Sequence, residues 1–378
     1  MQKMFTQLLG SIERELLNFR QSQKLYFVLG AVAVGLAIPL VASEYVVGEV
    51  LTPMIIFMIY ASSWNLLAYS GQGSLGHAAF LGIGGFASAL IVIKLNLPPV
   101  FGLLLGSLFS AGIGLLIGLA CVRLKAWFLA MVTFGFSVII VTLISQFDAV
   151  IGGIMGFPTP LLVERGLPFY YMTFALAAIS IFVMYLLIKS KTGLAFRAIH
   201  ENEPEAKMIG INIAKYKLIA FVLSTFFAGL AGGLYAQSIR YIQVSVFDPY
   251  YSFLPLMMAV IGGLRTIEGP IIGSVIIVTI DSYLHRIDNV LHGLMGPLFP
   301  NVSNVGPPLR MLSLGLFLVI VVIFLPKGVS SLLHKIHNYF REETKKADYW
   351  ERRVKSKWHC QKENMPKRSK GEGVVIWL

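Results

Sequence analysis

The sequence predicts an all-α polytopic membrane protein with about eight to ten transmembrane helices. Of its 378 residues, 56% are hydrophobic and only 13% are charged, whereas a soluble domain carries about 25% charged residues. The apolar segments are continuous, unlike the alternating strands of an outer-membrane barrel. They are also long enough for helices to cross a hydrocarbon core of about 30 Å. Helices, which satisfy their own backbone groups, are therefore the expected spanning elements.

The chain begins with a polar N-terminal segment, residues 1–24, which is expected in the cytoplasm. This segment mixes Glu13 and Glu15 with its basic residues, unlike the basic leader of a cleaved signal peptide, so the first apolar run is expected to be retained as a spanning helix. The candidate spans are 25–42, 47–68, 75–93, 100–122, 127–151, 169–188, 218–238, 251–264, 271–284 and 309–325. The eighth and ninth are short and flank "GGLRTIEGP"; tilted, broken and re-entrant segments all stay open for them.

The distribution of basic residues predicts the orientation, because lysine and arginine accumulate on the cytoplasmic side. With ten spans and a cytoplasmic N-terminus, all but five of the 31 basic residues lie inside. The exceptions are Lys94, Arg165, Arg240, Arg286 and Arg310. Both termini are therefore expected in the cytoplasm, with the transmembrane domain at 25–326 and a basic tail at 327–378. Membrane sidedness also explains the net charge of +12, so nucleic acid is not an expected partner, whereas anionic membrane lipid is one for the tail.

Small residues recur every four positions along the fourth span. They are Gly102, Gly106, Ser110, Gly114 and Gly118. This spacing places them on one face of a helix, where a neighbouring helix can approach closely, so we interpret them as helix-packing positions. The alternative is that the same face lines a pore.

Motifs for chemistry are missing from the sequence. It contains no G-x-x-x-x-G-K-[ST] phosphate loop, no H-E-x-x-H, no G-x-S-x-G and no Cys/His cluster, so we expect neither an enzyme nor a bound metal or cofactor. Acidic residues are nearly absent from the predicted spans: Glu49 and Asp148 lie within a few residues of a span end, and Asp281 lies near the outer end of the ninth span. A carrier driven by protons or sodium usually has more ionisable groups at membrane depth.

The largest predicted cytoplasmic loop, residues 189–217, has the pattern of two short helices. The first is expected over 193–200. Pro204 is well placed to open the second, and Gly210 to end it as a C-cap. Such a projection suits a membrane subunit that an energy-supplying partner must grip; the alternative is an ordinary connector.

Residues 69–86, "YSGQGSLGHAAFLGIGGF", combine polar residues and glycines with an apolar run. Transporters place broken helices at substrate sites, because the helix ends present unpaired N–H and C=O groups. Gln72, Ser74 and His77 are therefore candidates for lining a translocation path. The alternative is a tight cytoplasmic turn followed by a closely packed helix, in which His77 anchors the packing and does not relay protons.

Several segments resemble a known family. Glu205, Ala206 and Gly210 match part of the E-A-A-x-x-x-G signature of ABC importer permeases, with Pro204 standing where the signature has glutamate. "GQGSLGHAAFLGIGGF", "RAIHENEPEAKMIGINIAKYKLIAFVLSTFFAGLAGGLYA", "AVIGGLRTIEGPIIGSVII" and "GLFLVIVVIFLPKGV" are similar to segments of branched-chain amino-acid permeases of the LivM type. The resemblance covers about residues 50 to 330. "GGIMGFPTP" departs from the family's usual G-G-x-x-G-I loop.

The resemblance implies the permease subunit of an ABC importer for branched-chain amino acids in the bacterial inner membrane. It implies that Glu205, Ala206 and Gly210 belong to the coupling helix that docks on the ATPase. The partners it implies are a second homologous permease subunit, two ABC ATPase subunits and a periplasmic substrate-binding protein. A urea or short-amide permease of the same architecture, and an autonomous secondary carrier, are the alternatives.

Overall fold

The computed structural model describes residues 23–124, 126–146, 153, 155–159, 163–295, 306–325 and 328–331. The N-terminal segment 1–24 and the basic tail 327–378 that the sequence predicts lie largely outside the described residues. The chain divides into two units, Met1–Ser330 and Ser331–Leu378. Everything below concerns the first unit.

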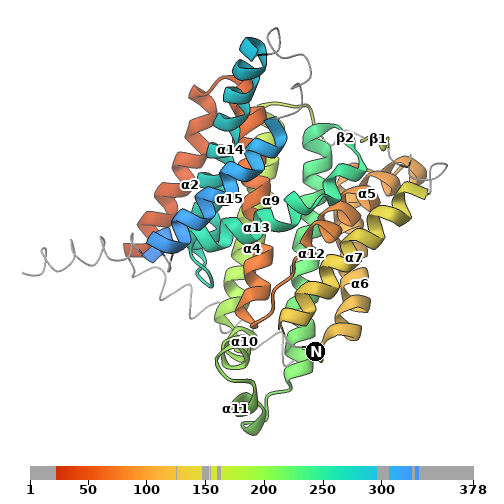
Figure 1. Cartoon of the computed structure of the whole chain (residues 1–378), viewed down its shortest axis with the longest axis vertical. Helices are drawn as coiled ribbons and strands as arrows, with labels where there is room; N and C mark the ends of the chain where they lie inside the picture. The colour runs from red at the N-terminus through yellow and green to blue at the C-terminus, as the bar shows by residue number, and fades with distance from the viewer. Residues whose placement is uncertain are drawn as a thin grey trace, which may run out of the picture. The chain divides into compact units, whose positions relative to one another are not determined.

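The described chain is almost entirely helical (Figure 1). Its helices are α2 (Gln23–Val41), α3 (Glu44–Val46), η1 (Val47–Leu51), α4 (Thr52–Tyr69), α5 (His77–Leu95), α6 (Pro99–Cys121), α7 (Ala126–Gln146), α9 (Leu167–Lys189), α10 (Lys191–Glu201), α11 (Glu203–Met208), α12 (Ile213–Ile239), η2 (Val244–Phe247), α13 (Pro249–Gly262), α14 (Glu268–Met295) and α15 (Gly306–Phe324). Two short strands, β1 (Phe157–Pro158) and β2 (Tyr241–Ile242), pair antiparallel. The prediction of an all-α fold is confirmed.

Six helical segments of the described chain are long and apolar enough to cross a membrane: Glu44–Tyr69, α5, α6, Trp127–Gln146, α9 and α12. The predicted total of eight to ten also counts α2, α13, α14 and α15. The bounds predicted for the ninth span, 271–284, are narrower than the helix that contains it. Helix α14 has 28 residues and continues through Arg286 and Asp288 beyond the apolar run. The eighth is short as expected, since α13 has 14 residues.

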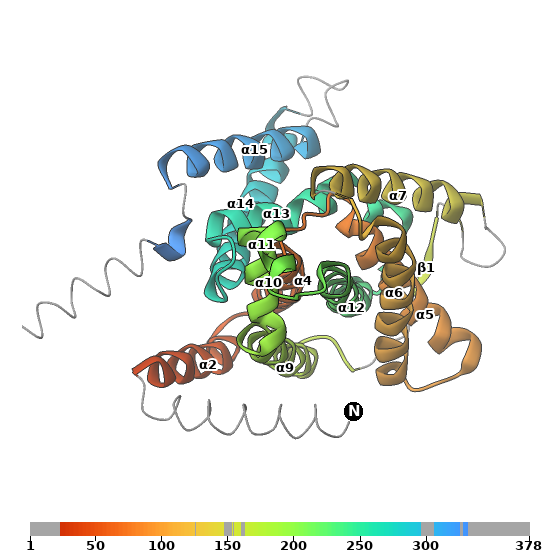
Figure 2. The same ribbon diagram turned by 90° about the horizontal axis from the view of Figure 1, so that it is seen from below.

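Helix α12 is the centre of the packing. It shares extensive contacts with α5 and α6, and further contacts with α4, and Figure 2 shows it between these helices. In its most apolar stretch 72% of the residues are buried, compared with 28% in α7 and in α9. The large apolar side chains exposed on α6 and α7 are those that a membrane protein presents to lipid.

The five small residues at the predicted packing positions of α6 are all buried. A Cβ atom on Gly106 would lie 2.7 Å from the backbone nitrogen of Ser88 in α5. Further along the same face, a Cβ on Gly114 would meet the side chain of Thr225 in α12. Between them, the Ser110 hydroxyl lies 3.0 Å from the carbonyl oxygens of both Phe80 and Thr225, and its single hydrogen can be donated to either of them or shared. The stripe therefore faces α5 at one end and α12 at the other.

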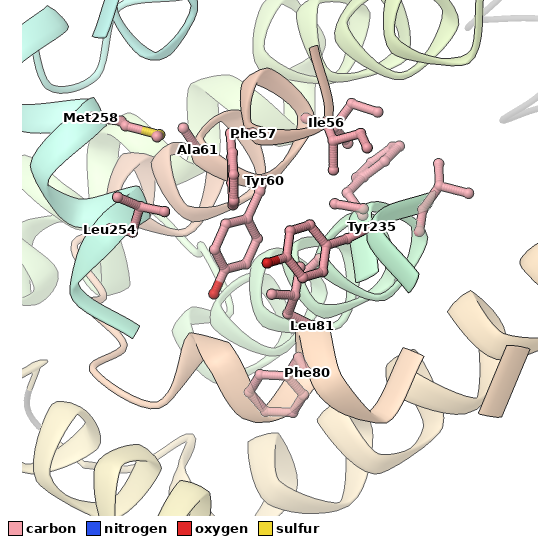
Figure 3. Close-up of a cluster of buried hydrophobic side chains, with 14 of the residues drawn as sticks. Ile56, Phe57, Tyr60, Ala61, Phe80, Leu81, Tyr235, Leu254 and Met258 are labelled. Carbon is pink, nitrogen blue, oxygen red and sulfur yellow. The ribbon is translucent and has the colours of Figure 1, made fainter. Parts of the chain in front are cut away.

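An aromatic cluster joins α4, α12 and α13 (Figure 3). The Tyr60 hydroxyl donates to the backbone carbonyl of Tyr251 at 2.8 Å, and the hydroxyls of Tyr235 and Tyr251 are 2.6 Å apart. Leu254 and Met258 of α13 fill the space beside them. A buried tyrosine needs a partner for its hydroxyl, and these bonds supply it while fixing three helices together.

Candidate functional site: the helical projection and the loop before α5

Helices α10 and α11 project from one end of the helix bundle (Figure 1). The Ser190 side chain caps α10 by accepting from the Thr192 backbone N–H at 3.2 Å. The apolar side chains of Phe196 and Ile199 are buried, and the Phe196 ring packs edge-on against Tyr216 of α12, 6.4 Å between centroids. The first predicted short helix, 193–200, is therefore present as α10, and one face of it is anchored on the bundle.

Helix α11 has well-defined ends. Pro204 lies in its first turn, where a missing N–H costs nothing. After its last residue, Gly210 has φ +85°. The Gly210 N–H donates to Lys207 O at 3.1 Å and the Ile211 N–H donates to Ala206 O at 3.0 Å. These two bonds form the Schellman motif, which requires a left-handed residue at this position.

The tip of the projection carries exposed apolar side chains. Met208 is 80% exposed and Ile209 is 75% exposed, although both lie outside the apolar spans. An exposed apolar pair on a polar projection is a candidate contact surface. Sequence reasoning missed both residues; the signal was an apolar pair directly before the capping glycine.

An ion pair joins α11 to α12. The Lys217 side chain is 4% exposed and is paired with Glu203, which is 48% exposed. A buried ammonium without a partner would be strongly destabilising, so this pair fixes α11 at the foot of α12. No sequence pattern predicts this pair, because Glu203 and Lys217 lie in different helices.

The loop between α4 and α5 is partly buried, and the predicted site residues Gln72, Ser74 and His77 are all buried. Gln72 accepts from the Ser70 hydroxyl at 3.2 Å. The Ser74 carbonyl accepts from the Trp64 indole N–H at 2.8 Å. The Ser74 hydroxyl has no hydrogen-bond partner among the described residues. The structure therefore brings these residues into one tightly packed turn.

His77 opens α5 inside this packing. Its Nε2 lies 3.0 Å from the Ser63 hydroxyl of α4, and its Nδ1 has no partner within the described chain. Its ring lies 5.4 Å from the ring of Tyr60 and 6.2 Å from that of Phe80. These contacts hold the imidazole between α4 and α5.

The same loop touches the projection. Gly71 has φ +74°, and a Cβ there would lie 3.2 Å from His200 Nδ1 of α10. Arg197 of α10 lies over the ring of Tyr69, 5.9 Å from its centroid. Desolvation, followed by the nearby Arg265 charge, lowers the pKa of His200 from its usual 6.5. Movement of α10 would therefore act directly on the loop before α5.

Asn65 of α4 holds the break between α13 and α14. Its Nδ2 donates to Thr266 O at 2.7 Å, and its Oδ1 accepts from the Arg265 N–H at 2.8 Å. Arg265 has φ +59° and Gly263 has φ +128°, so the chain reverses sharply here. This loop and the one before α5 meet the same part of α4, although they are far apart in sequence.

Comparison with known proteins agrees with this architecture. The profile of a protein family described as "Branched-chain amino acid transport system / permease component" matches residues 46–324. The high-affinity branched-chain amino acid transport system permease protein LivM of Salmonella typhimurium is 28% identical over 287 residues, covering 68% of this chain and 67% of the relative. LivM of Escherichia coli is 27% identical over 287 residues, covering 68% of this chain and 67% of the relative. The probable branched-chain amino acid transport permease protein LivH of Methanocaldococcus jannaschii is 30% identical over 221 residues, covering 51% of this chain and 67% of the relative.

No solved structure matches this chain. The apolar helices and the family match define the chain as the membrane permease component of a transport system, not a catalytic enzyme. The chain belongs to the family of branched-chain amino acid transport system permease components. It is accordingly the permease subunit of an ABC importer.

Proposed function

We propose that this permease imports branched-chain amino acids. The observation that carries the proposal is the family match over residues 46–324, and the relatives named above carry that substrate class in their names. The proposed assembly contains a second homologous permease subunit, two ABC ATPase subunits and a periplasmic substrate-binding protein. ATP hydrolysis by the partners would drive alternating access in this subunit.

The test is uptake of labelled L-leucine, L-isoleucine and L-valine by cells that express the complete importer, compared with cells lacking only this chain. Import should require both this chain and an active ATPase subunit. Uptake of urea or a short amide in place of the amino acids would replace the substrate assignment. Amino-acid uptake that continues with an inactive ATPase would instead favour an autonomous carrier.

The proposed site for coupling to the ATPase is α11 with Glu205, Ala206 and Gly210. Support comes from the buried Ala206, which holds one face of the helix on the bundle, and from the exposed Met208 and Ile209 on its tip. A helix that is anchored on one side and apolar on the other suits docking in a groove of a partner. The small residues of α6 are proposed to act in helix packing, because they are buried against α5 and α12.

The proposed orientation places α10, α11 and both termini in the cytoplasm. It rests on the distribution of basic residues and on the projection that an ATPase would need. A cysteine introduced at Lys207 should react only with membrane-permeant reagents, and one at Glu164 should react from outside. Labelling of Lys207→Cys from outside intact cells would reverse the orientation.

The proposed role of Gln72, Ser74 and His77 is to line the inner part of the translocation path. The unpartnered Ser74 hydroxyl and His77 Nδ1 support it, because buried polar atoms without partners are rare and need an explanation. Contact of this loop with His200 of α10 would place it under the control of the projection.

A further inference from the structure

A small pocket lies between α5 and α12, at the end of the bundle opposite the projection. Ser88 and Val92 of α5 form one wall, Gly233 and Gln237 of α12 the other, and Thr159, which follows β1, closes it. The centre of a water-sized sphere can occupy about 10 Å³ inside the pocket. This is roughly the room that one water molecule, or a group of similar size, requires.

The pocket contains a buried hydrogen-bond acceptor that lacks a donor. Gln237 is only 6% exposed, and its Oε1 has no partner among the described residues. Ser88 and Thr159 are buried beside it. The Thr159 hydroxyl donates to Ala236 O at 2.8 Å, so its own oxygen remains able to accept. An unsatisfied buried acceptor is costly, and a ligand that donates hydrogen bonds would remove that cost.

The position of the pocket favours a positively charged donor. Gln237 lies in the last turn of α12, which ends at Ile239, and the C-terminal end of a helix carries partial negative charge. Arg240 follows the helix, but its side chain is exposed to solvent, where salt screens its charge. Ser88, Thr159 and Gln237 can all accept hydrogen bonds, and three acceptors match the three donors of an ammonium group.

We infer that this pocket receives the α-ammonium group of the transported amino acid, with Gln237 Oε1 as its main acceptor. The inference rests on the proposed function, because it takes the substrate to be an amino acid. Only the ammonium group would enter, since the pocket has room for about one group of that size. The pocket would then be a substrate-binding site on the face of the permease away from the ATPase.

The first test measures the charge preference of the pocket in the assembled importer. Gln237→Cys is introduced into a full-length chain that carries Cys121→Ser and Cys360→Ser, with the exposed Gln243→Cys as the matched control. Each is treated with a cationic aminoethyl and an anionic sulfonatoethyl methanethiosulfonate. The ratio of cationic to anionic labelling rates should be about tenfold higher at position 237 than at position 243. Equal ratios, or no labelling at position 237, would overturn the inference.

The second test measures transport. Gln237→Leu should lower L-leucine uptake per assembled complex about tenfold, as expected for loss of one hydrogen bond to a charged group. Assembly and ATP hydrolysis should be retained, and Gln243→Leu should behave as wild type. Wild-type uptake by Gln237→Leu, or a loss matched by loss of assembled complex, would refute the inference and leave the proposed function standing. A wild-type importer that takes up no amino acid would instead refute the proposed function, and the assignment of the ammonium with it.

Discussion

The glycine stripe of α6 permits a test in which one helix supplies both the variant and its control. Gly106 is buried against α5, whereas nothing lies within 4 Å of a Cβ built on Gly112 of the same helix. Alanine at either position gains about 1 kcal/mol of helix propensity over glycine. That gain cancels when the two variants are compared, so their difference reports only the strain at the helix contact.

The size of that strain follows from the geometry. A Cβ on Gly106 would lie 2.7 Å from Ser88 N and 2.8 Å from Gly84 O, both backbone atoms, whereas ordinary contact begins at 3.4 Å. A backbone cannot rotate away as a side chain can, so the two helices must separate. Overpacking of this kind costs about 1–3 kcal/mol, and Gly106→Ala should therefore be less stable than Gly112→Ala by about that amount.

The assay is reversible unfolding of the purified subunit in mixed micelles with increasing sodium dodecyl sulfate. The expected difference corresponds to a factor of roughly 5 to 150 in the unfolding equilibrium constant. Equal stability of the two variants would show that the α5–α6 contact at Gly106 is not close, and the packing interpretation of the stripe would fail.

Three further predictions concern the candidate site. Substitution of both Met208 and Ile209 by Asp should abolish co-purification of the ATPase without reducing membrane insertion. Asp at the exposed Leu194 of α10 should leave co-purification intact. An effect of equal size at all three positions would show that the tip of the projection has no special role. Ser74→Ala should leave the free energy of unfolding within about 0.5 kcal/mol of wild type, since the Ser74 hydroxyl makes no hydrogen bond among the described residues. A larger loss of stability in the unfolding assay would reveal a structural role. A lower uptake per assembled complex would support the proposal that Ser74 lines the translocation path. The folded-state pKa of His200 is lowered below 6.5, its usual value in the unfolded chain. Folding therefore favours the neutral imidazole, and the stability that this contributes is present above pH 6.5 and is lost as the pH falls from the unfolded-state pKa to the folded-state pKa. The stability of His200→Gln should fall less than that of the wild type between pH 7 and pH 5, and identical profiles would contradict this reasoning.

Most of the helices could be predicted from the sequence, because they follow from a continuous apolar run or from local capping residues. Pro204 and Gly210 act within one short helix, so single-sequence reasoning could place both. The length of α14 was missed, since its polar end leaves no apolar signal. A helix can continue through polar residues once its own hydrogen bonds satisfy the backbone.

The contacts that organise the candidate site were beyond the reach of the sequence. Asn65 binds the backbone at Arg265 and Thr266, and no local pattern links positions so far apart. Glu203 and Lys217 each look like ordinary surface charges in the sequence. Only the packing shows that the Lys217 ammonium is buried and needs its partner.

Helix α12 connects the two ends of the molecule at which we place coupling and substrate recognition. Near its start Lys217 is paired with Glu203 of α11, and in its last turn Gln237 lines the pocket. Its 27 residues span about 40 Å at 1.5 Å per residue. A displacement of α11 that is transmitted through this ion pair would either bend α12 or shift it along α5.

Bending is opposed where it would otherwise be easiest. Gly232 lies in the C-terminal third of α12, but a Cβ there would meet the Leu81 carbonyl of α5. The two backbones are therefore already in close contact, and bending at this glycine would require them to separate. Sliding or tilting of α12 against α5 requires no such separation, and it changes the space between Ser88 and Gln237. The pocket lies at the interface that this movement alters, so its ability to hold a ligand would depend on the position of α11, the helix that we propose docks on the ATPase.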